Sequence, residues 1–127
     1  MKIRITEAFS DQGTSHVKFH SHNGSGRALW NGTAPKIGEI VDVEIDLDEA
    51  FSWGKNITPS SSKTPQITVL NGTTQITAEL MQGADEKCAA LQLGDSIILI
   101  ELDGPIAQKS GFVEVKATRI QLYPTNI

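Results

Sequence analysis

Apolar and polar side chains alternate with a period of two along much of this chain, and no other feature constrains the fold as strongly. The clearest stretch is residues 40–48, where from position 41 onward apolar side chains occupy the odd positions and acidic ones the even positions. The acidic row consists of Asp42, Glu44, Asp46 and Asp48. Successive side chains of a strand point to opposite faces, so this stretch is predicted to be a strand with one buried and one solvated face.

Similar alternation recurs in residues 2–8, 16–22 and 113–117, and strands are also expected at 27–30, 66–70 and 75–81. Asn-Gly pairs begin at Asn23, Asn31 and Asn71, and this dipeptide favours tight turns because it tolerates positive φ. The continuous apolar run at 96–102 suits a strand buried on both faces. Helix is expected only as a short turn at 48–53 and as an alternative to a strand at 84–93. The sequence therefore predicts an all-β fold, a small antiparallel β-barrel or sandwich, with at most one or two short helices.

The strongest loop signal is the Pro/Ser-rich segment 59–65, which lies near the middle of the chain. We therefore expect an N-terminal β unit at 1–58, a connector at 59–65 and a C-terminal β unit at 66–127, packed as one body. Residues 36–39 and 92–95 carry similar Gly-Glu and Gly-Asp turns before apolar strands, and the two pieces align with a one-residue gap. This leaves both an internal duplication and two unrelated halves open. In the spacing of its expected strands and in these turns, each half loosely resembles the five-stranded oligonucleotide/oligosaccharide-binding (OB) barrel. This resemblance implies an architecture and assigns no site residues.

Charge and composition narrow the classes of partner. The 127 residues carry a formal net charge of −4, and the basic residues are scattered singly without a basic stripe. One cysteine excludes an intramolecular disulfide, and the N-terminal residues lack the apolar core of a signal peptide. We expect a cytoplasmic protein with no membrane association and no cofactor.

The leading hypothesis is a non-enzymatic protein-binding module. Its predicted contact residues are the acidic row together with the adjoining Phe51 and Trp53, which would anchor a partner if they were exposed. A basic or amphipathic protein would complement the row, and either an accessory subunit or an inhibitor of the immunity-protein type would fit. Alternatively, the acidic row is a solvated face that discourages edge-to-edge aggregation, or a calcium site. Open strand edges could also pair two copies into a homodimer.

The alternative function is an OB-like protein that binds single-stranded nucleic acid, which would need aromatic platforms and nearby cations. The candidate residues are Lys18, Phe19, Arg27, Trp30 and Lys36. The acidic composition opposes this reading, because phosphate binding draws on clustered positive charge. It is therefore ranked second.

A metal or catalytic centre ranks third. His16, His20 and His22 share one parity of a predicted strand and could chelate a transition metal if a further ligand lay nearby. Cys88, with Ala89 and Ala90 beside it, is expected to be a buried, inert thiol. The sequence contains no nucleophile elbow, phosphate-binding loop, dinucleotide fingerprint or zincin motif, so we expect no catalytic residues and no bound metal.

Overall fold

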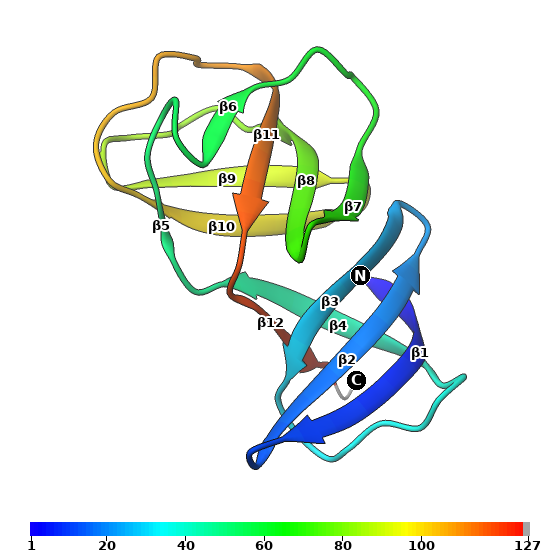
Figure 1. Ribbon diagram of the computed structural model, residues 1–127. Helices are drawn as coiled ribbons and strands as arrows, with labels where there is room; N and C mark the ends of the chain where they lie inside the picture. The colour runs from blue at the N-terminus through cyan, green and yellow to red at the C-terminus, as the bar shows by residue number, and fades with distance from the viewer. Residues whose placement is uncertain (126–127) are drawn as a thin grey trace.

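The computed structural model describes residues 1–125, and the described chain consists of strands and turns without a helix. Figure 1 shows two groups of strands joined where the chain crosses between them. The first group contains β1 (Lys2–Asp11), β2 (Thr14–Ser21), β3 (Gly24–Trp30), β4 (Ile40–Leu47) and β12 (Ile120–Pro124). The second contains β5 (Ala50–Phe51), β6 (Ile57–Pro59), β7 (Gln66–Leu70), β8 (Thr73–Leu80), β9 (Cys88–Leu93), β10 (Ser96–Leu102) and β11 (Gly111–Ala117).

The first group is a closed five-stranded barrel, which we call the terminal barrel. Its strands follow the order β1-β2-β3-β12-β4, and β4 returns to pair with β1. All neighbours are antiparallel except β3 and β12, which run parallel. Closure therefore depends on the last strand of the chain, which fills the gap between β3 and β4.

The remaining strands, β5–β11, form the inserted group, because they lie between β4 and β12 along the chain. β8 is its centre: β11 pairs along β8 from Gly111 to Ala117, while β7 and β9 pair with successive parts of β8. β9 and β10 form a hairpin, and the short β5 pairs in parallel with the last two residues of β10, Glu101 and Leu102.

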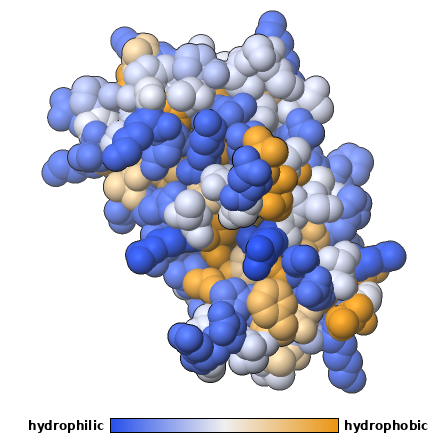
Figure 2. Space-filling model, in the orientation of Figure 1, coloured by the Kyte–Doolittle hydropathy of each residue, from blue (hydrophilic) through white to orange (hydrophobic). Residues whose placement is uncertain are grey.

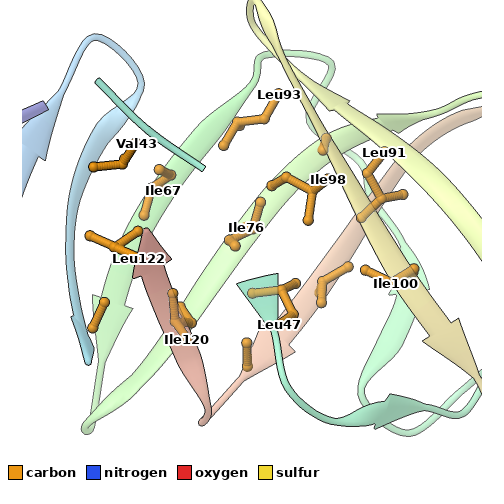
Figure 3. Close-up of a cluster of buried hydrophobic side chains, with 14 of the residues drawn as sticks. Val43, Leu47, Ile67, Ile76, Leu91, Leu93, Ile98, Ile100, Ile120 and Leu122 are labelled. Atoms are coloured by element: carbon orange, nitrogen blue, oxygen red, sulfur yellow. The ribbon is translucent and has the colours of Figure 1, made fainter. Parts of the chain in front are cut away.

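One hydrophobic core runs through both groups. The buried side chains in Figure 3 come from β4 and β12 of the terminal barrel and from β7–β10 of the inserted group, and they point into a common interior. Leu122 of β12 and Leu91 of β9 are both fully buried. Burial of large aliphatic side chains contributes roughly 1.5–3 kcal/mol each, so this interior fixes the two groups against each other.

The prediction of an all-β barrel fold is confirmed. The short helical turn expected at 48–53 is wrong, and of the two alternatives for 84–93 the strand is correct. The segment after Asp48 is extended and contains β5, and the ambiguous segment 84–93 ends in strand β9. Asp85 does receive backbone N–H groups, those of Lys87 at 2.7 Å and Cys88 at 2.9 Å, but it caps a turn before a strand. Side-chain capping of a tight turn resembles helix capping in sequence, which explains why a helix was an alternative for 84–93.

Strand pairing crosses the expected connector at 59–65. β5 and β6 precede it and pair with β10 and β11, whereas β12 follows it and pairs with β3 and β4. The division into units 1–58 and 66–127 concerns folding units and stays a prediction, as does the internal duplication. The Asn71-Gly72 turn has positive φ at both residues, 53° and 78°, as that dipeptide predicts. The described chain holds no helix with the length and apolar character needed to cross a bilayer.

Candidate functional site

The acidic row lies on the outer face of the terminal barrel, as the alternation predicts. Asp42, Glu44 and Asp46 are exposed on β4, and Asp48 is exposed just after its end. The intervening Val43 and Leu47 are buried in the core. β4 therefore presents carboxylates to solvent from a rigid strand.

A groove of about 570 Å³ runs beside this row, between β4 and β10, with β12 contributing one wall. Its lining residues are Glu44, Ile45, Asp46, Ile97, Leu99 and Tyr123. Three of them are large and unusually exposed: Ile97 is 59% exposed, Leu99 72% and Tyr123 41%. Large apolar side chains gathered in one concave site, rimmed by polar groups, commonly mark an interaction surface.

A second hollow of about 290 Å³ continues the groove, because it shares Asp46 and Leu99 with it. This hollow adds Asp48, Glu49 and Glu101 to the lining. We call the groove and the hollow together the acidic groove. Among residues 1–125, no Lys, Arg or His lines it. The site thus combines an apolar floor with carboxylates contributed by both β4 and β10.

Part of this site was missed from the sequence. The run 96–102 was expected to be buried on both faces, but only Ile98, Ile100 and Leu102 face the core, while Ile97 and Leu99 face solvent. Glu101 has the same parity as the exposed pair and was the available signal for an outer face. Tyr123 gave no such signal, because its place in the groove depends on β12 pairing with β4.

The aromatic residues expected to flank the acidic row lie elsewhere. Phe51 is fully buried, so a partner cannot contact its side chain. Trp53 is partly buried and packs against the core. Phe51 is the last residue of the short strand β5, which pairs with β10, and Trp53 follows two residues later. Large apolar side chains are more often buried than exposed, and both of these face the core.

Glu49 fixes the chain at the end of the acidic row. Its carboxylate accepts hydrogen bonds from the Thr118 amide (3.2 Å), the Thr118 hydroxyl (2.9 Å) and the Arg119 amide (3.1 Å). These bonds join the β4–β5 connection to the β11–β12 connection, the two places where the chain passes between the strand groups.

The residues proposed for nucleic-acid contact do not form a stacking surface. Phe19 is 1% exposed and Trp30 is 7% exposed, and the Trp30 Nε1–H donates to the Thr33 carbonyl oxygen at 2.8 Å. The Lys18 ammonium lies 3.3 Å from the Glu7 carboxylate. Arg27 is exposed on β3, whereas Lys36 is exposed in the loop before β4.

The three histidines do not converge. His16 stacks on Phe9, with ring centroids 5.1 Å apart, and His20 Nδ1 lies 2.9 Å from the Ser25 hydroxyl oxygen. His22 falls in the turn after β2. Within residues 1–125, no group of three or more His, Cys, Asp or Glu side chains is arranged to hold a metal ion.

Cys88 is exposed, contrary to the expectation of a buried thiol. It begins β9 at the strand edge, with its Sγ 3.8 Å from an Asp85 carboxylate oxygen. The negative charge of Asp85 raises the pKa of the Cys88 thiol, which disfavours the reactive thiolate. Another hollow, of about 620 Å³ between segments 82–86 and 105–110, is lined by mixed polar and apolar loop residues.

Comparison of the chain with protein-family models, with curated proteins and with solved structures gives no match. The acidic groove stands out on its own geometry. It offers exposed apolar contact area and negative charge together.

Proposed function

We propose that this protein is a non-enzymatic binding module that captures a basic, amphipathic segment of another protein in the acidic groove. The observation that carries the proposal is the pairing of exposed Ile97 and Leu99 with carboxylates on both sides and no basic residue in the lining. This arrangement is complementary to a segment whose apolar side chains are flanked by Lys or Arg.

The apolar side chains and the carboxylates of the acidic groove would contribute to binding in different ways. Covering Ile97 and Leu99, which are more than half exposed, would contribute about 1–2 kcal/mol for each side chain. The carboxylates of Glu44, Asp46 and Glu101 lie at solvent-exposed positions and would chiefly speed the approach of a basic partner and exclude acidic ones. Either an accessory subunit or an inhibitor of a cationic enzyme would use a surface of this kind.

A second copy of the chain is a poor occupant of the groove. Two copies meeting through this surface would place Glu44, Asp46 and Glu101 against like charges. Like charges at an interface disfavour association. A homodimer through an open strand edge elsewhere stays a prediction.

Binding of single-stranded nucleic acid is the second candidate, favoured by one observation. The closed strand order β1-β2-β3-β12-β4 is compatible with an OB-like barrel, an architecture that many nucleic-acid binders share. Burial of Phe19 and Trp30 removes the expected stacking platforms, so this function ranks below protein binding.

Charge reversal in the groove tests the proposal. The test variant combines Glu44→Lys, Asp46→Lys and Glu101→Lys. The tagged variant and wild-type protein are isolated from the native host at low salt, with and without nuclease, and copurifying proteins are quantified by mass spectrometry. We expect a stoichiometric, basic, nuclease-resistant partner with the wild type and its loss from the variant.

A matched control carries three reversals outside the groove: Asp11→Lys, Glu79→Lys and Glu86→Lys, all at exposed positions. Both variants change net charge equally, so retention of the partner by this control would localise binding to the acidic groove. Loss of the partner from both variants would point to a nonspecific charge effect. Capture that depends on nucleic acid would favour the second candidate.

A further inference from the structure

A hollow separate from the acidic groove lies on β3 and is lined by positively charged residues in place of carboxylates. It measures about 260 Å³, and its lining includes His16 of β2, Arg27 of β3 and Arg119 of the β11–β12 connection. Apart from these three, its lining residues are uncharged: Ala28, Leu29, Gly72, Thr74, Ala117, Thr118 and Ile120. We call this site the basic hollow.

The fold creates the hollow by leaving part of one strand edge uncovered. β3 pairs with β7 at Gly24 alone and with β12 only at Leu29 and Trp30. Arg27 lies between these two points of pairing, on the outer face of β3. The β7–β8 turn lines the other side of the hollow through Gly72.

Arg119 is held beside Arg27 by the connection on which it lies. The Arg119 amide and the Thr118 amide both donate to the Glu49 carboxylate, at 3.1 Å and 3.2 Å. These bonds fix the backbone and leave the guanidinium group free to turn toward a ligand. Two acidic residues contact this connection. The Glu49 oxygens are occupied by the backbone and the Thr118 hydroxyl. The Asp48 amide donates to the Arg119 carbonyl oxygen at 2.9 Å, and the Asp48 carboxylate accepts from Gln121 at 3.2 Å.

Within residues 1–125, neither arginine of the hollow has a carboxylate within ion-pair distance. In residues 1–125 the ion pair within 4.0 Å is Lys18 with Glu7, on the neighbouring strands β2 and β1. Lys18 is also the cross-strand partner of Arg27, but Glu7 offsets its charge, so the positive charge of the site rests on the two arginines. In a chain of net charge −4, two arginines around one concavity form a local reversal of charge.

We propose that the basic hollow binds a small phosphate dianion, either free phosphate or a phosphate monoester. Guanidinium groups match the oxygens of phosphate through paired N–H donors, which makes arginine the preferred residue for such ligands. A hollow of about 260 Å³ is smaller than the usual range for a larger organic ligand, so it suits one phosphate group. Buried Phe19 and Trp30 leave no platform here for a run of stacked bases. This proposal is independent of partner capture in the acidic groove.

Titration of the full chain with inorganic phosphate tests it, with amide chemical shifts as the readout. At fixed ionic strength we expect saturable shifts at Gly72, Thr118 and Arg119. Arg27→Gln and Arg119→Gln should each weaken binding about tenfold, because each removes a charged donor. Arg4→Gln, an equal change of charge at an exposed position on β1, should change binding less than about twofold.

Amide spectra of the three variants without phosphate would establish that each remains folded. Equal phosphate affinity in Arg27→Gln, Arg119→Gln and the wild type would overturn the proposal. Identical shifts produced by potassium chloride alone would also overturn it, as a general salt effect. A short oligothymidylate that binds more tightly than phosphate, with steep salt dependence, would replace it with nucleic-acid backbone binding.

Discussion

Replacing Gly24 with alanine tests how the terminal barrel is attached to the inserted group. Gly24 is the residue through which β3 pairs with β7, opposite Ile67, and the Ile67 amide donates to the neighbouring Asn23 carbonyl oxygen at 2.8 Å. Gly24 has a φ of 128°, which L side chains rarely adopt. An added Cβ would lie 2.1 Å from the Ile67 carbonyl oxygen, a backbone atom that cannot swing aside.

The expected cost has two parts. The unfavourable φ alone costs about 1–3 kcal/mol. Separating the strands would add the loss of the Ile67–Asn23 hydrogen bond, about 1 kcal/mol, together with disturbed packing of Ile67, which is 2% exposed. We therefore expect Gly24→Ala to lower the free energy of unfolding by about 3 kcal/mol or more.

Gly13→Ala is the matched control. Gly13 also has a positive φ, 80°, but a Cβ there would meet no atom within 4 Å. Its cost should be about 1–2 kcal/mol, from backbone strain alone. Urea unfolding followed by tryptophan fluorescence measures both variants. The reasoning would be refuted if Gly24→Ala were no more destabilising than Gly13→Ala.

Three further predictions concern the surface and the connections between the strand groups. Leu99→Asp should abolish partner capture and change unfolding free energy by less than about 0.5 kcal/mol, because Leu99 is 72% exposed; strong destabilisation measured by urea titration would contradict its placement. Glu49→Ala should lower the free energy of unfolding by about 1–2 kcal/mol, because the amides of Thr118 and Arg119 lose their acceptor. An unchanged urea midpoint would show that these hydrogen bonds do not stabilise the fold. Asp85→Asn should lower the raised pKa of the Cys88 thiol, so iodoacetamide alkylation should quicken near neutral pH; superimposable pH–rate profiles would exclude the electrostatic cause.

The local part of the site could be predicted from sequence, because it depends on a strict alternation. Residues 40–47 place Val43 and Leu47 in the core and Asp42, Glu44 and Asp46 outside, as their spacing indicates. Such a pattern records which face of a strand is solvated. It carries no information about which strand lies alongside.

The remainder of the site depends on contacts distant in sequence. Hydropathy at 97–100 is uniformly high, so it could not distinguish the buried Ile98 from the exposed Leu99, and Glu101 was the one sign of an outer face. The position of Tyr123 follows from closure of the barrel by β12, a pairing with β4 across more than half the chain. Phe51 was predicted to contact a partner, if exposed, because it follows the acidic row, but the chain turns inward there to form β5.

Whether an exposed apolar side chain belongs to an interaction surface depends on the side chains around it in the folded protein, not on its position along the chain. Figure 2 shows that hydrophilic residues cover most of one face and that hydrophobic residues reach it in small separate groups. Isolated groups of this kind are normal on proteins. The groove between β4 and β10 differs because Ile97, Leu99 and Tyr123 share one concavity with carboxylates.

Site-specific photo-crosslinking in the native host tests the central claim most directly. A photoreactive residue replaces Leu99 in the acidic groove and, as a control, the exposed Glu79 on β8. Capture by the acidic groove predicts a crosslink from position 99 to a Lys/Arg-rich, amphipathic segment of another protein, with little or no product from position 79. Equal products from both positions, or crosslinks from position 99 to nucleic acid, would contradict it.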